Sequence, residues 1–150
     1  MRARAWRTAA LAATVAALSC QSATGPTGPS FTLAAVEVEG TPLPAVVVSW
    51  PDHHLELLAD TVRFFRDDRW ARVRVERFTG IDGVPRIRRE ERAGTAVRLG
   101  TRILLVPDCP PDADCVPGEE LEPVAGGYEL EWRYSAEIRV TILYREAGVS

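Results

Sequence analysis

Apolar and polar residues alternate along most of the chain from Phe31 onward, with turn residues about every ten to fifteen positions. Alternation with a period of two is typical of strands that bury one face, and evenly spaced short strands are typical of a sandwich or barrel. We expect eight or nine antiparallel strands in an up-and-down meander, depending on how the first two runs are divided. The runs are residues 31–39, 45–50, 60–66, 70–78, 86–91, 95–99, 102–106, 128–134 and 138–145.

The loop length of the first clear hairpin can be tested by its register. Directly opposite residues share a face of the sheet, so the correct register places apolar residues opposite apolar ones. A two-residue loop at Asp67 and Asp68 separates the apolar positions from the charged ones. The two opposed arginines that result would require nearby acidic side chains. The expected pairs are Phe64 with Ala71, Val62 with Val73, and Arg63 with Arg72.

Two later hairpins can be tested in the same way. A loop at Gly100 and Thr101 suits a type II′ turn, which takes glycine first, and places Val97 opposite Leu104. The last hairpin needs a three-residue loop at residues 135–137, since a shorter loop would set an apolar residue against an arginine. The expected pairs there are Tyr134 with Ile138, Trp132 with Val140, Leu130 with Ile142, and Tyr128 with Tyr144.

Residues 52–66 also fit a helix, because Leu55, Leu58, Val62 and Phe65 lie near helical spacing and a proline stands at the start. A helix would leave Val62 without its hairpin partner, so we prefer a strand. A short helical turn over residues 51–58 is compatible with both interpretations.

The first 19 residues have the pattern of an export signal. A basic patch precedes an apolar stretch at residues 9–18, which is too short to span a bilayer. Small residues precede Cys20 and suit cleavage there. Residues 21–30 contain no apolar side chain larger than alanine and read as a flexible tether. We therefore expect a signal peptide at 1–19, a tether at 20–30 and one folded domain at 31–150.

The segment Ala17-Leu18-Ser19-Cys20 resembles the lipobox of bacterial lipoproteins, although that family prefers leucine where Ala17 stands. The resemblance implies that Cys20 is acylated and holds the protein on a lipid bilayer. Several acyl chains on one residue give stable anchoring. Gln21, in place of aspartate, implies sorting to the outer membrane, on its periplasmic side or at the cell surface. A plain secreted protein with a free or intermolecular Cys20 is the alternative.

The remaining two cysteines, Cys109 and Cys115, make a natural pair in an exported chain and leave Cys20 odd. We expect a disulfide that pins a long loop at residues 107–127. A catalytic redox pair would more typically show two cysteines two residues apart beside a βαβ unit.

Composition limits the classes of function. With 150 residues, 46% of them apolar, the chain fits one domain plus appendages. Its 18 basic residues are all arginine, and without the three in the leader the balance is 15 − 21 = −6. An acidic product is a poor candidate for nucleic-acid binding.

A wider resemblance covers roughly residues 31–146. A first strand ends in Glu-Gly-Thr-Pro-Leu-Pro at 39–44, a hairpin at 58–70 reads Leu-Ala-Asp-Thr-Val-Arg-Phe-Phe-Arg-Asp-Asp-Arg-Trp, and Arg-Ala-Gly-Thr-Ala follows at 92–96. Together they resemble the small lipocalin-like lipoproteins of bacteria, which implies a meander β-barrel. Asp68 stands where that group has glycine, and Ala96 where it has an aromatic residue. These motifs carry no chemistry.

The sequence nominates no catalytic, cofactor or metal site. His53 and His54 would point to opposite faces of a strand. The acids at 108, 112 and 114 lack the glycine and glutamate of a calcium loop. Glutamates at 90–91 and 119–122 read as solvated edges. We expect a protein that is not an enzyme.

A basic cluster lies in the run at residues 86–92, and two interpretations are open for it. It has the charge to meet lipid headgroups near an anchor. The interspersed glutamates favour an exposed strand stabilised by salt bridges. The cluster consists of Arg86, Arg88, Arg89 and Arg92.

Four aromatic residues carry the leading hypothesis of function. In an eight-stranded barrel, Phe64, Tyr128, Trp132 and Tyr144 would line a cavity for one small apolar ligand. A barrel filled by its own side chains is the alternative structure, and about 120 residues favour it. A structural or protein-interaction module of the envelope is the alternative function. The sequence identifies neither ligand nor protein partner.

Overall fold

The computed structural model describes residues 30–110, 113–115 and 117–148. The expected signal peptide at 1–19, the acylated Cys20, most of the tether and Asp112 lie outside the described residues.

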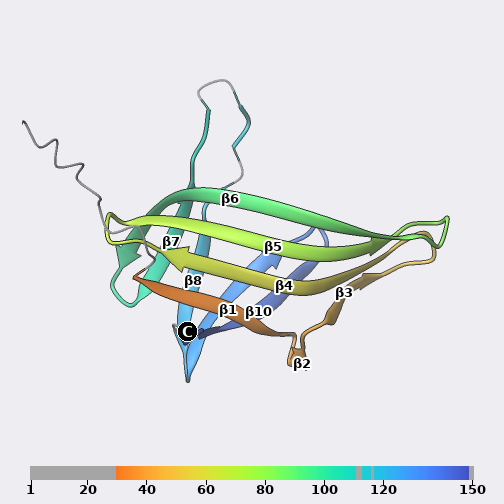
Figure 1. Cartoon of the computed structure of the whole chain (residues 1–150), viewed down its shortest axis with the longest axis horizontal. Helices are drawn as coiled ribbons and strands as arrows, with labels where there is room; N and C mark the ends of the chain where they lie inside the picture. The colour runs from red at the N-terminus through yellow and green to blue at the C-terminus, as the bar shows by residue number, and fades with distance from the viewer. Residues whose placement is uncertain (1–29, 111–112, 116, 149–150) are drawn as a thin grey trace, which may run out of the picture.

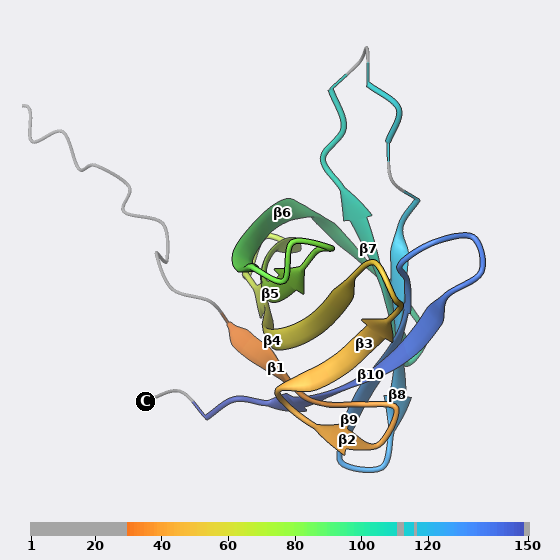
Figure 2. The same ribbon diagram turned by 90° about the vertical axis from the view of Figure 1, so that its right-hand side faces the viewer.

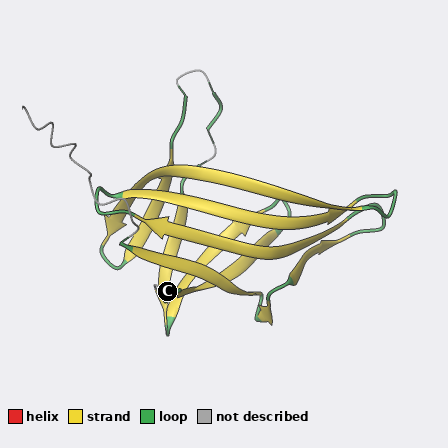
Figure 3. Ribbon diagram, viewed as in Figure 1, coloured by secondary structure: helices red, strands yellow, loops and turns green. Residues whose placement is uncertain are grey.

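The described residues form strands and loops and contain no helix (Figure 3). Ten antiparallel strands make one continuous sheet (Figure 1). The strands are β1 (Phe31–Val38), β2 (Thr41–Pro42), β3 (Ala45–Ser49), β4 (His54–Phe64), β5 (Arg69–Thr79), β6 (Pro85–Leu99), β7 (Arg102–Pro107), β8 (Glu119–Val124), β9 (Gly127–Arg133) and β10 (Arg139–Glu146).

Eight of these strands close into a barrel. From β4 to β10 each strand pairs with the next, β10 pairs with β1, and β1 pairs with the end of β4. Figure 2 shows the sheet curling round on itself. The short β2 and β3 are additions, on β1 and on the start of β4. The fold is the antiparallel meander that the alternation predicts, and it is consistent with a lipocalin-like barrel.

Strand boundaries differ from the expected ones in three places. The strand expected at 60–66 starts earlier, since β4 begins at His54 and buries Leu55 and Leu57 completely; the alternative helix over residues 52–66 is not formed. The runs at 86–91 and 95–99 join into one long strand, β6. The loop expected at 107–127 contains β8, whose Leu121 is fully buried. The sequence pattern did not predict this strand, because glutamates surround Leu121 and no apolar alternation is visible there.

Two hairpin registers are confirmed. Val97 lies opposite Leu104, across a turn in which Gly100 has φ 67°. Val140 lies opposite Trp132, and Tyr134 donates its backbone N–H to the Ile138 oxygen at 3.0 Å across the three-residue loop.

The expected register of the β4–β5 hairpin is wrong by one residue. The Phe65 N–H donates to the Arg69 oxygen at 2.9 Å, so the loop has three residues and ends at Asp68. Three-residue loops commonly place their last residue in the left-handed region, and Asp68 has φ 59°. A slip of one residue exchanges the two faces of a strand. The observed pairs are Phe64 with Trp70, Val62 with Arg72, and Arg63 with Ala71.

Aromatic side chains pack together at the end of the barrel where β1 begins. Phe31 stacks on Phe64 with ring centroids 4.3 Å apart. The Trp70 indole N–H donates to the backbone oxygens of Thr95 and Val106, at 3.1 and 3.3 Å. Apart from Trp132 and Tyr144, the remaining buried core is aliphatic, and nearly every barrel strand contributes at least one buried side chain to it.

Candidate functional site: a buried ion cluster and an open strand edge

The barrel centre holds an aspartate between two arginines. Arg72 donates from Nε and Nη2 to the two carboxylate oxygens of Asp60, at 2.8 and 2.6 Å. Arg74 donates from Nε to Asp60 Oδ2 at 2.8 Å. The three residues are 1–3% exposed. Their arrangement follows from the register: Arg74 lies directly opposite Asp60, and Arg72 is two residues away on the same face.

Asp60, Arg72 and Arg74 together are called the ion cluster. Side chains from three more strands contact it from across the barrel. The Tyr144 hydroxyl of β10 donates to Asp60 Oδ2 at 2.9 Å and accepts from Arg72 Nη2 at 2.6 Å. Glu119 of β8 accepts from Arg72 Nη1 at 2.5 Å. The Arg74 guanidinium lies 3.8 Å from the ring centroid of Trp132, on β9. The ion cluster therefore connects β4 and β5 to β8, β9 and β10.

Asp60 and Arg72 both keep their charge in this buried position. Burial by itself would raise the pKa of the Asp60 carboxyl, but the charges and hydrogen bonds of Arg72 and Arg74 outweigh it and leave that pKa lowered. Burial likewise opposes the charge of Arg72, and its acidic partners keep the pKa of that guanidinium well above its usual value. Burial raises the pKa of the Tyr144 hydroxyl. Asp60 is thus held as an anion with both oxygens occupied, an arrangement suited to joining strands rather than to moving protons.

The four aromatic residues expected to line a ligand cavity make different contacts, although Trp132 and Tyr144 both touch the ion cluster. Phe64 stacks at the chain-entry end, Tyr144 belongs to the ion cluster, and Trp132 covers Arg74. Tyr128 is half-buried against the apolar core. Of the four, Trp132 borders an open groove.

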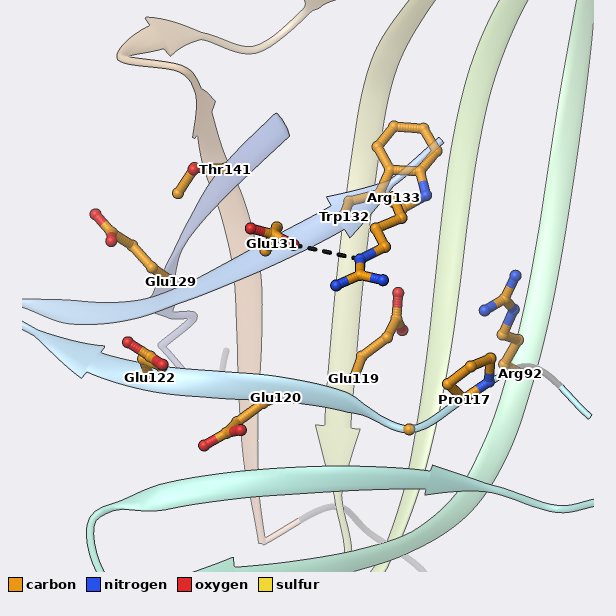
Figure 4. Close-up of a pocket in the computed structure, with 11 residues that line it drawn as sticks. Arg92, Pro117, Glu119, Glu120, Glu122, Glu129, Glu131, Trp132, Arg133 and Thr141 are labelled. Carbon is orange, nitrogen blue, oxygen red and sulfur yellow. Dashed lines mark hydrogen bonds and ion pairs between the residues drawn. The ribbon is translucent and has the colours of Figure 1, made fainter. Parts of the chain in front are cut away.

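That groove has a volume of about 590 Å³ and lies beside β8 and β9 (Figure 4). Its charged lining is mostly glutamate, and several of these glutamates are neutralised by ion pairs. Glu119 pairs with Arg72, Glu120 with Arg102, and Glu131 with Arg133 and Arg139. The lining residues are Arg92, Pro117, Gly118, Glu119, Glu120, Glu122, Glu129, Glu131, Trp132, Arg133 and Thr141.

The first half of β6 forms an open edge of the sheet. β6 pairs with β5 from Pro85 to Thr95, but with β7 only from Gly94 to Leu99. In the described part of the chain no strand pairs with the other side of residues 85–93. The basic cluster found in the sequence lies on this edge. Sequence reasoning located the arginines but not the edge, because β7 and β8 had to be placed first.

The expected disulfide pair is brought together. Cys109 and Cys115 are bonded, with Cα atoms 5.7 Å apart, a normal separation for a disulfide. Both lie in the exposed loop between β7 and β8, and Asp108 beside them pairs with Arg69.

Within the described part of the chain, the histidines and acids form no metal-binding group. His53 lies against Trp50 and Phe78, while His54 begins β4. Among the described residues, no three His, Cys, Asp or Glu side chains gather as a metal site would require.

None of the described residues forms a helix able to cross a membrane. Comparison of the chain with protein-family models, with curated proteins and with solved structures found no match. The described part of the chain is thus an antiparallel eight-stranded barrel with a buried ion cluster and with an open strand edge along the first half of β6.

Proposed function

We propose that the protein is an exported lipoprotein of the bacterial cell envelope, held to a membrane through acylated Cys20, and that its barrel is a non-catalytic module that binds another protein. The leader, the lipobox-like segment before Cys20 and the odd cysteine count support export and anchoring. The lipocalin-like resemblance of residues 31–146 supports membership of that group of lipoproteins.

The observation that carries the interaction role is the occupied centre of the barrel. Pockets for apolar ligands are lined mainly by apolar and aromatic side chains, with few polar groups. Here the centre contains Asp60, which forms ion pairs with both Arg72 and Arg74. A ligand entering there would separate buried ion pairs, which is strongly unfavourable. Binding is therefore expected on the outer surface.

The outer surface offers a concentrated region for such binding at one end of the molecule. β4, β5 and β6, with β3 along the start of β4, extend past the remaining strands there (Figure 1). Large apolar side chains are exposed on this extension: Trp50 46%, Ile81 88%, Val84 52% and Ile87 61%. Exposed apolar residues gathered in one place mark interaction sites more often than isolated ones do.

Native mass spectrometry of the delipidated protein from cell extract separates this role from small-ligand binding. We expect the mass of the protein alone. One apolar molecule retained per chain would contradict the proposal and support a ligand-binding barrel.

Metabolic labelling with a palmitate analogue tests the anchor. We expect label on the wild type and none on Cys20→Ala. A Cys109→Ser/Cys115→Ser variant is the matched control and should keep the label. Label that persists in Cys20→Ala, or a wild type without label, would contradict anchoring through Cys20.

A further inference from the structure

The β6–β7 hairpin has apolar residues on its outer face as well as on its inner one. In β7, residues 103–106 read Ile-Leu-Leu-Val, a continuous apolar run that is typical of a strand covered on both sides. Ile103 and Leu105 are buried inside the barrel. Successive residues of a strand point to opposite faces, so Leu104 and Val106 face outward. The barrel covers the inner side of this run and leaves Val106, on the outer side, 39% exposed.

Two residues of β6 extend this apolar surface. Val97 lies opposite Leu104, and Leu99 lies two residues further along on the same face. Val97 is 40% exposed and Leu99 is 45% exposed. The four outward apolar residues of the two strands are called the hairpin face: Val97, Leu99, Leu104 and Val106. Adjacent exposed apolar side chains indicate a surface that meets another molecule.

The hairpin face lies at the end of the barrel where the chain enters. Ser30 donates its backbone N–H to the Phe64 oxygen at 2.6 Å. Phe64 leads into the β4–β5 loop, whose Asp68 oxygen accepts from the Ala96 N–H of β6 at 2.7 Å. Figure 1 shows the start of β1 and the turn between β6 and β7 at the same, left-hand end of the molecule. One loop therefore separates the point of entry from the hairpin.

The length of chain before Ser30 identifies what covers this face. Cys20 and Ser30 are 30 − 20 = 10 residues apart. A chain of that length spans at most about 36 Å. A bilayer that holds Cys20 is therefore never further than this from the chain-entry end. The extension lies beyond the far end of β5, which has 11 residues and a length of about 36 Å. Of the two exposed apolar regions, the hairpin face is thus the one held near lipid.

The charges around the hairpin face are compatible with lipid headgroups. Residues 95–106 contain two arginines, Arg98 and Arg102, and no aspartate or glutamate. Arg102 pairs with Glu120 at 2.7 Å. In the adjoining loop, residues 66–68 read Arg-Asp-Asp, so attraction between charges does not select the lipid. The contact depends on the apolar side chains, while arginines beside them can place their stems against lipid and their charges at the headgroups.

We propose that the hairpin face lies in the surface of the lipid bilayer that holds Cys20. The barrel then stands with its chain-entry end on the membrane, and the extension that carries Trp50 and Ile81 points away from it toward a protein partner. A small apolar face is sufficient for this contact, because the anchor keeps its effective concentration at the lipid high. The inference rests on the proposed anchoring and adds the orientation of the barrel.

Spin labels test this orientation in the full lipidated protein, reconstituted into vesicles of phosphatidylethanolamine and phosphatidylglycerol. Val97→Cys and Leu99→Cys carry the label on the hairpin face. Ile81→Cys, which is on the extension and also replaces an exposed apolar residue, is the matched control. Oxygen concentrates in lipid, whereas a nickel chelate stays in water. The ratio of oxygen to nickel collision rates should be several-fold higher for the labels at 97 and 99 than for the label at 81.

The wild type separates failure of the inference from failure of the proposed anchoring. It should take up no spin label, because Cys20 is acylated and Cys109 is bonded to Cys115. Spin label on Cys20 of the wild type would contradict the anchoring, and the inference with it. In an acylated protein, equal collision ratios at 97, 99 and 81 would overturn the inference alone. Labels at 97 and 99 that neither reagent reaches would also overturn it, since a second copy or another protein would then cover the hairpin face.

Discussion

Asp60 and Arg72 form a bidentate ion pair at the centre of the barrel, with N···O distances of 2.8 and 2.6 Å. Because Arg72 also bonds to Tyr144 and Glu119, the pair joins the β4–β5 hairpin to strands near the end of the chain. Buried charges survive only when paired and hydrogen-bonded. The closed barrel therefore holds a polar network in a place where an apolar core is usual.

Removal of the Asp60 charge should destabilise the protein strongly. Asp60→Asn leaves Arg72 and Arg74 buried without their shared anion, and breaking a buried pair in this way costs about 3–5 kcal/mol. Urea unfolding at pH 7 measures the loss. The exposed Asp114→Asn is the control and should stay within about 0.5 kcal/mol of wild type. A loss below about 1 kcal/mol in Asp60→Asn would show that the ion cluster does not stabilise the fold.

The stabilising effect of Asp60 should disappear in acid. Its pKa is lowered in the folded protein, so the folded state favours the ionised carboxylate. The stabilisation is complete above the unfolded pKa, about 3.9, and is lost as pH falls from there through the lower folded pKa. The difference in unfolding free energy between wild type and Asp60→Asn should therefore be constant near neutrality and shrink below about pH 4. A difference that vanishes already at pH 6 would contradict the pairing.

Loss of the Tyr144 hydroxyl should cost less than loss of the aspartate. Tyr144→Phe removes one donor to Asp60 and one acceptor for Arg72, which predicts a loss of about 1–3 kcal/mol. Urea unfolding of the single variants and of the double variant with Asp60→Asn completes a cycle. Because the two residues share partners, the double variant should lose less than the sum. Strict additivity would mean that they act independently.

Asp68 should accept glycine and reject β-branched residues. Its φ of 59° is easy for glycine and difficult for valine. Asp68→Gly should change the unfolding free energy by less than about 1 kcal/mol, while Asp68→Val should lower it by about 1–3 kcal/mol. Thermal and urea unfolding of both variants provide the comparison. Equal stability of the two would contradict the three-residue loop.

Gly94 should be intolerant of any side chain. A Cβ added there would lie 1.9 Å from the Val106 oxygen on β7, a distance that forces the strands apart. Gly148 has nothing within 4 Å of the same added atom and an ordinary φ, so it is the matched control. Gly94→Ala should lower the melting temperature clearly and Gly148→Ala should leave it unchanged. A normal melting temperature for Gly94→Ala would contradict the close β6–β7 contact.

Local pattern accounts for much of the fold. The pairs Trp132 with Val140 and Val97 with Leu104 were predictable, because in both hairpins the apolar positions match in one register only. Strand β8 was missed, because its single buried residue, Leu121, stands among glutamates that belong to ion pairs with distant arginines.

The candidate site could be predicted only in part. The arginines of residues 86–92 are visible in the sequence, but the open edge exists because β7 leaves β6 at Gly94. The aromatic residues were expected to share a cavity. Which of them meet depends on neighbours such as Phe31 and Arg74, which come from other strands.

The sequence by itself determined the all-β class, the antiparallel order and most hairpin pairs, since alternation and turn residues act over a few positions. Only the tertiary structure decided that Arg72 and Arg74 point inward and Val73 outward. That choice depends on a loop one residue longer and on partners 12 to 72 positions away that neutralise the buried charge. A local pattern cannot predict that an arginine is buried, because a buried charge is stabilised by residues that are close in space and distant in sequence.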